Sequence, residues 1–444
     1  MPTKEYNTFF DEIQKKFHIE CIGYTPKGYP CPGMYYRLTE IRVHISCRNC
    51  GSPVTYIHEY KTGRTVTGGV YLGVPTYYEM INIRYECKFC DATFMRGYAC
   101  LPTDHTVTDE TEQYIVWSLG SKTFSTLAEE TGLSVQSISN RAEAFAQEER
   151  KTMLSCRYRF LSMDEVFIGR NEDKSHVIYF ALNDISNPWK SNNVMVSNAG
   201  RTEKNVIKYL KQLKHPESVE AVCMDMWQAY VTAVAAVLPN AVVVIDRFHV
   251  IKAAKESMNA ARRSLEAPKK VKDAMKKDAA LFICPMDKLS KDEWQRLEGY
   301  LNTDEKLEHT YFLVQELLEF YYARSYDEAL EFLCTWESHV HRSGIDLPIY
   351  DTVCNWLPYI LNYFRFRITN GKMEGRNNLI RQIDRMGFHY GIDCFQGCLY
   401  AHDRKQEYIK WQRYLRKKAI GNRSNKRSSI VKDSQSSKQF VQAV

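Results

Sequence analysis

The stretch "VEAVCMDMWQAYVTAVAAVLPNAVVVID", residues 219–246, has the pattern of a strand, a helix and a second strand. Two short apolar runs, VEAVCM and AVVVI, enclose a segment whose apolar residues recur at helical spacing. An aspartate follows each run directly: Asp225 follows VEAVCM, and Asp246 follows AVVVI. A strand, helix and strand in succession predict a parallel strand pair with the helix packed on one face of the sheet.

The segment upstream of this unit extends the same sheet. The patterns CRYRFLSMDEVFIG, HVIYFALNDIS and NNVMVSN predict three successive strands, and TEKNVIKYLKQL predicts a helix. Three strands followed by alternating helices and strands is the arrangement of a ribonuclease-H-like sheet. We assign residues 155–265 to this domain.

The segment downstream has an almost purely helical pattern over residues 266–360, which predicts an inserted α-domain. The sheet domain is then expected to return over residues 361–410. The predicted fold is a multidomain α/β protein: a ribonuclease-H-like domain with a large all-α insertion, preceded by two smaller modules.

Residues 1–100 are rich in Tyr, Gly and Thr, and the alternation in YRLTEIRVHIS and MINIRYEC predicts short strands. Cys47-x-x-Cys50 precedes Cys87-x-x-Cys90 by thirty-six residues. Four thiolates at this spacing are typical of a zinc ribbon that holds one structural Zn²⁺. The alternative, two unrelated pairs or one redox pair, is disfavoured because both pairs lie beside predicted strands in a segment poor in aliphatic residues.

Residues 105–150 predict three helices, in the sequences TDETEQYIVWSLG, SKTFSTLAEETGL and SVQSISNRAEAFAQEER. Gly132 would lie in the turn between the second and third helices, and Ser134 would cap the N-terminus of the third, as in a helix-turn-helix domain. An inward stripe would comprise Ile138, Ala142 and Phe145. The residues expected to face the DNA major groove are Gln136, Ser137, Asn140 and Arg141. A plain helical hairpin is the alternative.

Charge is concentrated at the end of the chain. The formal net charge is +7, and the segment Arg416–Val444 alone has eight Lys and Arg residues against one acid, Asp433. We therefore predict a basic, disordered tail over residues 411–444 that either aids solubility or attracts phosphate. No signal peptide or apolar run of membrane length is recognisable, so a cytoplasmic protein without a membrane partner is expected. Most of the other cysteines are scattered singly through apolar segments, as small buried hydrophobic residues are.

Three carboxylates suggest chemistry. Asp164 and Asp225 follow apolar strand runs, at the sheet edge where ligands collect in open α/β folds. Glu374 begins a helical segment, MEGRNNLIRQIDR, that is otherwise rich in cations. Two Mg²⁺ ions about 4 Å apart need such carboxylates. Each residue also has a structural interpretation, since Asp often ends strands and Glu in a first helical turn gains about 0.3–1 kcal/mol from the helix dipole.

The amino-acid sequences of several motifs resemble those of a known family. MDE at Asp164, GR at Gly200, MDMWQAY at Asp225, LPNAVVVIDRFHVIK and TNGKMEGRNNLIRQIDRMGFHYG closely resemble the catalytic domain of bacterial insertion-sequence transposases of the ISL-three family. The order of zinc ribbon, helix-turn-helix and catalytic domain is also similar. One departure is the first knuckle, Cys-Arg-Asn-Cys, where a proline often follows the first cysteine in the family.

The resemblance implies a DDE triad of Asp164, Asp225 and Glu374 that binds two Mg²⁺ or Mn²⁺ ions. Asp246 and His249, in the DRFH motif, would support the site. Double-stranded DNA, as terminal inverted repeats and target, would be the partner, and a homodimer or larger assembly is expected because two DNA ends must be held together. The cations expected to hold DNA are Arg201, Arg367, Lys372, Arg376 and Arg381. The alternative is that half or more of the last four are ordinary charges on a solvated face. Trp227 and Trp336 would either stack on a base or pack in the core.

Two other functions fit the same residues less well. A domesticated zinc-ribbon and helix-turn-helix regulator would bind DNA without catalysis, but it has no need of three intact acidic positions. A host repair or junction nuclease with the same fold would not account for the amino-acid sequences of these motifs.

Overall fold

The protein is described by a computed structural model covering residues 13–28, 31–98, 106–170, 176–187, 190–371, 373–387 and 390–440. Within these ranges, the side chains of residues 170, 176, 177, 190–192, 374 and 417–440 lie outside the description. The chain divides into two compact units. Unit 1 comprises residues 1–149 and 383–444, and unit 2 comprises residues 150–382.

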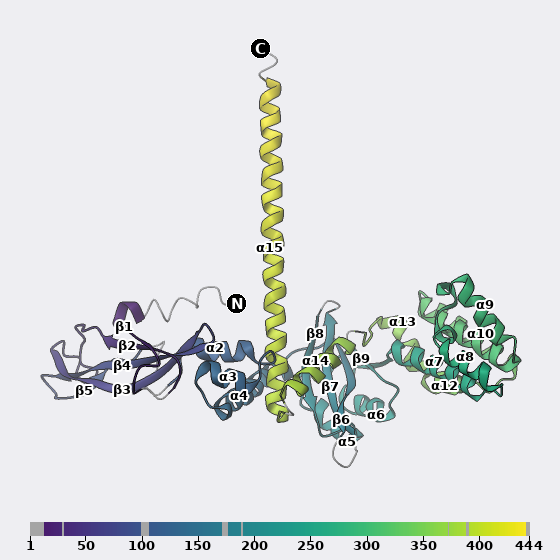
Figure 1. Cartoon of the computed structure of the whole chain (residues 1–444), viewed down its shortest axis with the longest axis horizontal. Coiled ribbons are helices and arrows are strands. Elements are labelled where there is room, and N and C mark those ends of the chain that lie inside the picture. Colours follow the sequence, from purple (N-terminus) through teal and green to yellow (C-terminus); the bar gives the residue numbers. More distant parts are fainter. Residues whose placement is uncertain are drawn as a thin grey trace. The chain divides into compact units, whose positions relative to one another are not determined.

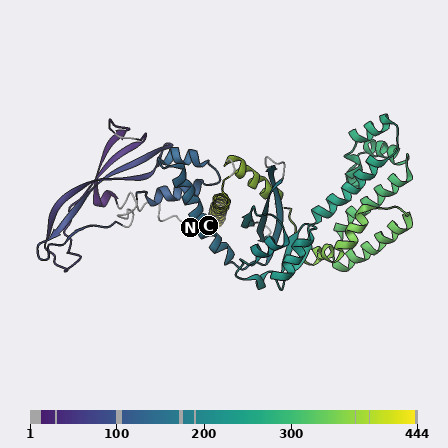
Figure 2. The same cartoon turned by 90° about the horizontal axis from the view of Figure 1, so that it is seen from below.

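Unit 1 opens with a five-stranded sheet of order β1-β2-β4-β3, with β5 paired to β4. Its strands are β1 (Phe17–Tyr24), β2 (Met34–Glu40), β3 (Thr55–Tyr71), β4 (Val74–Cys87) and β5 (Thr93–Met95). β3 and β4 form a long antiparallel hairpin, which twists visibly in Figure 2. The predicted β module is thus observed, although β2 covers only the first part of the predicted strand YRLTEIRVHIS.

A small core stabilises this sheet. Seven buried residues form it, from strands β1 to β4 and from the segments before β1 and after β5: Ile13, Phe17, Leu38, Val66, Tyr78, Met80 and Tyr98. Alternate residues of β4 reach it, as the period of two in a strand requires. The sheet therefore has a hydrophobic core that does not depend on the four cysteines.

Three helices follow the sheet: α2 (Asp109–Ser118), α3 (Phe124–Thr131) and α4 (Val135–Leu154). Each begins at a hydroxyl cap, Thr108, Thr123 or Ser134, whose oxygen accepts a backbone N–H three residues later. Gly132 ends α3 in the left-handed region, with a φ of 69°. The three predicted helices, the cap at Ser134 and the turn at Gly132 are all confirmed.

The last helix of unit 1, α15 (Ile392–Phe440), packs closely against α2 and α4. Two glycines permit this approach. A methyl group on Gly120, whose φ is 71°, would lie 2.5 Å from the Cys398 carbonyl oxygen, and one on Gly397 would lie 2.5 Å from that of Ala142. Tyr390, just before α15, stacks on Phe124 with 4.1 Å between ring centroids. The start of α15 is therefore part of the core of unit 1.

Two expectations concern this end of the chain. The segment 361–410, predicted to return to the sheet domain, is divided between the two units, because residues from 383 onward belong to unit 1. The predicted tail over residues 411–444 overlaps α15, which continues through Phe440. No proline interrupts residues 392–440, so the helix started by packing can propagate along the chain.

Unit 2 contains a second five-stranded sheet, of order β10-β9-β6-β7-β8 (Figure 1). β6 (Phe160–Arg170), β7 (His176–Asn187) and β8 (Lys190–Ser197) are antiparallel neighbours, while β9 (Ala221–Met224) and β10 (Val242–Ile245) run parallel to β6. α5 (Glu203–Leu210) and α6 (Gln228–Val237) connect the strands. Every strand and helix predicted between residues 156 and 246 is confirmed.

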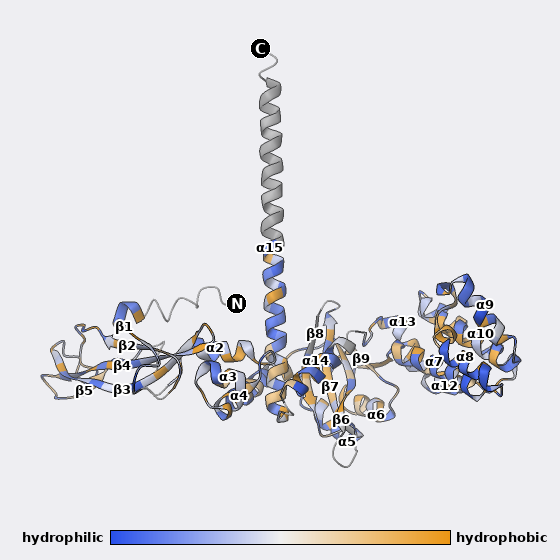
Figure 3. Cartoon of the chain, in the orientation of Figure 1, coloured by the Kyte–Doolittle hydropathy of each residue, from blue (hydrophilic) through white to orange (hydrophobic). Residues whose placement is uncertain are grey.

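Helices form the rest of unit 2. They are α7 (Arg247–Ser264), α8 (Lys269–Lys277), α9 (Lys291–Leu301), α10 (Glu305–Glu319), α11 (Tyr326–Ser343), α12 (Pro348–Leu361), α13 (Tyr363–Phe366) and α14 (Met373–Met386). Short 3₁₀ helices occur at Pro216–Ser218, Leu281–Ile283, Met286–Lys288 and Phe320–Tyr322. The insertion helices carry both hydrophilic and hydrophobic residues (Figure 3), as amphipathic helices around a core do. No helix among the described residues is long and apolar enough to cross a membrane.

Trp336 anchors the core of the insertion. Its side chain is only 1% exposed, and its indole N–H donates to the Leu313 carbonyl oxygen at 2.9 Å. Of the two interpretations for this tryptophan, the structure supports core packing. A base could not stack on it without opening the domain.

Trp336→Ala is expected to destabilise unit 2 by about 3–5 kcal/mol, because it removes a large buried ring and leaves the Leu313 carbonyl without its donor. Denaturant unfolding followed by circular dichroism would measure the loss. Leu330→Ala on the same helix, at a side chain that is 38% exposed, should change the free energy of unfolding by no more than about 0.5 kcal/mol. Equal losses for the two variants would contradict this assignment.

Candidate functional site

Three aspartates lie at one level of the unit 2 sheet, on three adjacent parallel strands. The register pairs Ser162 with Cys223 in β6 and β9, and Ile245 with Met224 in β10 and β9. Continuing that register sets Asp164 beside Asp225, and the Asp246 N–H donates to the Met224 carbonyl at 3.0 Å. The strand-end position predicted from the sequence is therefore correct for Asp225 and Asp246. Asp164 lies within β6, because that strand continues to Arg170.

Asp164 is buried, with 8% of its surface exposed. Burial and the neighbouring charge of Asp225 raise the pKa of Asp164 to about 6. Two hydrogen bonds oppose this shift, from the Asn377 Nδ2 to Oδ2 at 2.8 Å and from the Glu165 N–H to Oδ1 at 2.7 Å. The charge of Asp225 therefore disfavours the ionised form of Asp164.

His249 is the direct partner of Asp225. Its Nε2 lies 2.6 Å from the Asp225 Oδ1. Burial lowers the pKa of His249, but the hydrogen bond and charge of Asp225, with Asp246 and Asp164 beyond, raise it by more. This shift favours the cationic form of the imidazole, which lies in the first turn of α7 next to the carboxylates.

Asp246 has a different task. It is 1% exposed, and its Oδ1 accepts the backbone N–H of Asn370 at 3.2 Å. Burial raises the pKa of Asp246, and the Asn370 N–H opposes that shift. Since Asn370 lies in the loop just before α14, Asp246 ties that loop to the end of β10.

α14 runs along β6 in the same direction. Met373 Sδ lies 3.4 Å from Ser162 Oγ, Asn377 donates to Asp164, and the Arg381 Nε donates to the Phe167 carbonyl at 3.1 Å. Backbone position 374 lies between the first two of these contacts, one helical turn before Asn377. The Glu374 side chain itself lies outside the described residues.

Glu165 organises a second polar group beside the aspartates. The Arg201 Nη1 lies 2.9 and 2.7 Å from its two carboxylate oxygens, and the Tyr230 hydroxyl donates to its Oε1 at 2.9 Å. The Arg201 guanidinium also lies over the Trp227 ring, 4.4 Å from the centroid. Trp227 is 40% exposed, so it is not a core residue.

The other cations expected to hold DNA differ in their surroundings. Arg367 donates to the carbonyls of Ala323 and Arg324 at 2.9 and 2.7 Å, and Arg376 is buried. Arg381 is half-buried and bonded to Phe167, and Lys372 lies outside the described residues. Arg367 therefore has a structural task that its sequence context did not indicate.

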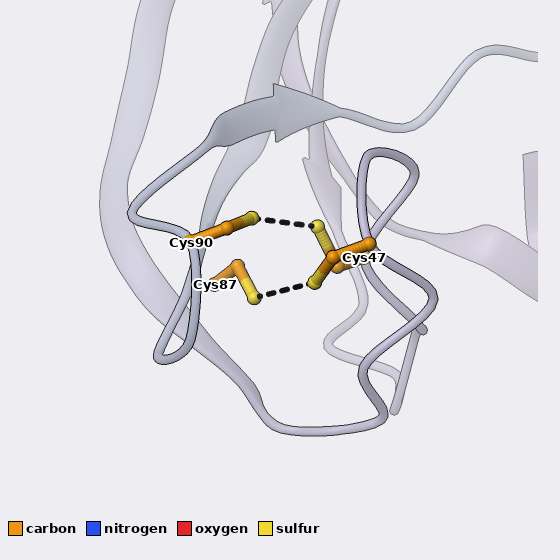
Figure 4. A group of neighbouring side chains, drawn as sticks. Cys47, Cys87 and Cys90 are labelled. Atoms are coloured by element: carbon orange, nitrogen blue, oxygen red, sulfur yellow. Dashed lines mark hydrogen bonds between the residues drawn. The ribbon is translucent and has the colours of Figure 1, made fainter.

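The four cysteines of unit 1 meet in one cluster, with all their Sγ atoms within 4.8 Å of one another (Figure 4). The Cys47–Cys90 and Cys50–Cys87 sulfur distances are both 3.6 Å. A zinc tetrahedron with bonds of about 2.3 Å has edges of about 3.8 Å, and a disulfide would need about 2.05 Å. The spacing prediction is confirmed: the four thiols could hold one metal ion and form no disulfide.

Both cysteine loops have the same backbone geometry. The Cys47 N–H donates to the Ser52 carbonyl and the Cys87 N–H to the Ala92 carbonyl, at 2.8 and 3.1 Å. The N–H groups of Asn49 and Phe89 each point at the preceding cysteine sulfur at 3.4 Å. The Phe89 N–H, together with that of Cys90 and the neighbouring thiols, lowers the pKa of Cys87 to about 6. Cys87 is thus a thiolate at neutral pH, the form that binds metal.

The residues expected to read DNA lie on α4. Gln136 and Asn140 are exposed and joined by a 2.8 Å hydrogen bond, while the half-buried Arg141 pairs with Glu112 at 2.8 Å. Ser137 is half-buried and bonded to Arg141. Ile138 and Ala142 are fully buried and Phe145 is half-buried, which agrees with the predicted inward stripe.

Asn377 and Glu165 belong to the site but were missed from the sequence. Asn377 could have been found, since it lies three residues after Glu374 and helix positions three apart share a face. Glu165 could have been suspected as a charge within an apolar strand. No local pattern indicates that Arg201 or Tyr230 would bond to it.

Comparison with known proteins agrees with this geometry. A family model described as "Transposase", for the ISL-three group of DDE enzymes, matches residues 161–396, more than half of the 444 residues. The chain is also similar to the transposase for insertion sequence element IS1001 of Bordetella parapertussis, with 23% identity over 356 residues that cover 78% of this chain and 85% of that protein. From the aspartate-bearing sheet to the start of α15, this chain belongs to the ISL-three family of insertion-sequence transposases.

Proposed function

We propose that this transposase cuts and joins DNA strands at a two-metal site formed by Asp164, Asp225 and Glu374. The observation that carries the proposal is the placement of Asp164 and Asp225 side by side on adjacent parallel strands. Burial, together with the charge of Asp225, raises the pKa of Asp164 to about 6. Two carboxylates that repel each other in a buried site are stabilised by a divalent cation. A regulator without catalysis would gain nothing from this arrangement.

We further propose that the unit 2 sheet is ribonuclease-H-like. Three antiparallel strands are followed by two strands parallel to the first, and the fourth and fifth strands extend the sheet on the side of the first. This order supports the expectation from the sequence. It also brings the first and fourth strands, which carry Asp164 and Asp225, next to each other.

The donor set suits Mg²⁺ or Mn²⁺, which prefer carboxylate oxygens. Asp164 and Asp225 would each hold a metal ion, and Glu374 would complete the set from α14. The contacts of Met373 and Asn377 with β6 support this, because position 374 lies between them. When bound, two such ions lower the pKa of an attacking water or 3′-hydroxyl and neutralise the leaving oxygen.

The protein's own groups would prepare the reaction. Asn377 and the Glu165 N–H fix the Asp164 carboxylate, and the His249 imidazole fixes that of Asp225. Asp246 holds the loop before α14 and so sets where that helix begins. Arg201 pairs with Glu165 beside the aspartates, and its guanidinium lies over the Trp227 ring. It would bind a phosphate of the strand being cut.

DNA recognition is assigned to unit 1. We propose that α3 and α4 form a helix-turn-helix whose exposed Gln136 and Asn140 read base edges in the terminal inverted repeats. The four-cysteine cluster would hold one structural Zn²⁺, since its set of four thiols leaves no open position for catalysis. A homodimer or larger assembly would hold the two ends of the element together.

The test is cleavage of a duplex that carries the element's own terminal repeats. Purified protein with Mg²⁺ or Mn²⁺ should nick at the repeat ends and join the freed 3′-hydroxyl to a target duplex. With Ca²⁺ it should bind the same duplex without cutting. Metal-independent cutting would contradict the proposed site, and binding without cutting in Mg²⁺ would favour a regulator.

A further inference from the structure

An apolar cavity of about 380 Å³ lies in unit 1 between the sheet and α2. This is within the range of about 300–1,000 Å³ typical of small-ligand sites. Aromatic side chains dominate its walls, from Tyr36, Tyr71, Tyr78, Tyr114 and Trp117. Tyr78 is buried, whereas Tyr71 and Trp117 are 59% and 37% exposed, so the cavity has a closed inner end and an open mouth.

One carboxylate faces this aromatic lining. Glu110 is part of the cavity wall, and its Oε2 is buried without a hydrogen-bond partner among the described residues. Burial raises the pKa of Glu110, while its own backbone N–H and the Thr108 side chain oppose that shift, so the unpaired acceptor is the Oε2 atom alone. An orphaned acceptor in an apolar cavity is costly unless a ligand supplies a donor. The pair of features, flat aromatic walls and one unpaired acceptor, selects for a flat ligand that carries an N–H group.

Two lysines accompany the aromatic residues that α2 contributes. The Lys122 Nζ donates to the Tyr114 hydroxyl at 2.8 Å and is balanced by Glu130. The Lys405 Nζ lies 5.4 Å from the centre of the Trp117 ring and donates to Ser121 Oγ at 3.3 Å. Lys405 and Tyr408, both on α15, contact the Trp117 ring without lining the cavity. The positive charge of Lys405 beside Trp117 would attract an anionic group attached to the ligand.

We propose that this cavity binds one unpaired nucleobase with an exocyclic amino group, extruded from a DNA strand. The base would stack on the aromatic walls and donate its amino group to the Glu110 carboxylate, while its phosphate lies near Lys405. The proposal rests on the proposed function only in taking DNA as the substrate. It adds a site outside the metal centre and outside the helix-turn-helix residues.

The charges favour a nucleobase over a side chain from a protein partner. An arginine or lysine could satisfy Glu110, but Lys405 at the exposed wall would repel it. A purely apolar side chain would fill the cavity and leave Glu110 without a partner. A nucleotide satisfies both ends, because its base carries the donor and its phosphate carries the negative charge.

Equilibrium binding of the full-length protein tests the site. Fluorescence anisotropy would compare a fully paired duplex with the same duplex carrying one extrahelical cytosine or one extrahelical N3-methylthymine, which has no N–H donor, in buffer without Mg²⁺ or Mn²⁺ so that no cleavage occurs. The cytosine duplex should bind more tightly than both others. Trp117→Ala should weaken its binding by roughly fivefold or more, since one aromatic stack contributes that much. Trp411→Ala, at a tryptophan that is 53% exposed outside the cavity, should have no such effect.

Glu110→Leu tests the acceptor separately. It should remove the preference for cytosine over N3-methylthymine while leaving both bound, and the thermal unfolding of the variant should show that unit 1 is folded. Equal binding of the paired and extrahelical duplexes by the wild type would overturn the proposal. So would an equal effect of Trp117→Ala and Trp411→Ala, or dissociation of a dimer by Trp117→Ala without change in DNA binding, which would assign the cavity to a second copy of the chain. None of these outcomes affects metal-dependent cleavage, which tests the proposed function independently.

Discussion

Asp164→Asn and Glu374→Gln are each expected to reduce Mg²⁺-dependent DNA cleavage by roughly 10³-fold or more, while leaving binding of the terminal repeats unchanged. The metal ions contribute several kcal/mol to stabilisation of the transition state, and each 1.4 kcal/mol is about tenfold in rate. An amide in place of one carboxylate removes a charge that the ions need. Gel-based cleavage and binding assays on the same preparations would separate the two steps.

Asp164→Asn should also stabilise the metal-free protein, which an ordinary inactivating substitution would not do. The pKa of Asp164 is raised to about 6 in the folded chain, above its ordinary value of about 4. The folded state therefore gains stability as the pH falls from above 6 toward 4, and it is least stable above pH 6. Asparagine resembles the protonated acid, so the variant should gain up to roughly 2–3 kcal/mol at pH 7, since one pKa unit equals about 1.4 kcal/mol.

The local hydrogen bonds can adapt to this substitution. The asparagine oxygen would still accept the Glu165 N–H, and the Asn377 amide can turn so that its buried Oδ1, which has no partner in the described part of the chain, accepts the new NH₂ group. Thermal unfolding without Mg²⁺ but with zinc retained would measure the gain at pH 5 and pH 8. It should be larger at pH 8.

A matched control is available on the insertion. Glu331→Gln, at an exposed position of α11, makes the same chemical change away from the sheet. It should alter neither DNA cleavage nor the pH dependence of thermal unfolding. Wild-type rates for Asp164→Asn, or a loss of stability that is independent of pH, would show that Asp164 and Asp225 do not act as a coupled metal-binding pair.

The sequence predicted the strands of unit 2 well because their signals are local. Runs such as VEAVCM and AVVVI allow few other conformations, and the aspartates that follow them are set by the strand ends. Once the parallel register is known, Asp164, Asp225 and Asp246 must lie at one level. The candidate site was therefore predictable in its position along the sheet.

The partners of these residues were not predictable, because they depend on contacts between distant segments. Nothing around Arg201 indicates that it pairs with Glu165, and nothing around Arg367 indicates that its guanidinium bonds to Ala323 and Arg324. The same limit applies to the segment after α14. Helical periodicity predicts that α15 is a helix, but only the close packing at Gly120 and Gly397 shows that it belongs with α2 and α4.

The cysteine cluster leads to the second large effect. Cys87→Ser is expected to reduce bound zinc from about one per chain to nearly none, because a structural site with three thiolates and a weakly bound hydroxyl loses most of its affinity. Cys87 is chosen because the backbone N–H groups of Phe89 and Cys90 lower its pKa and so favour the thiolate form that binds metal. Metal analysis by inductively coupled plasma mass spectrometry would measure this. Cys21→Ser, at an exposed thiol of β1, should keep its zinc.

The structural consequence of losing zinc should be confined to one end of the sheet. The hydrophobic core around Leu38, Val66 and Met80 is separate from the cysteine loops and should persist. The loops at Cys47–Ser52 and Cys87–Ala92 are held by short backbone bonds and by the cluster itself, so their amides should exchange with solvent far faster in Cys87→Ser. Hydrogen exchange that remains slow in both loops after zinc is lost would mean that the metal is not what folds them, and that the four thiols are gathered by the backbone alone.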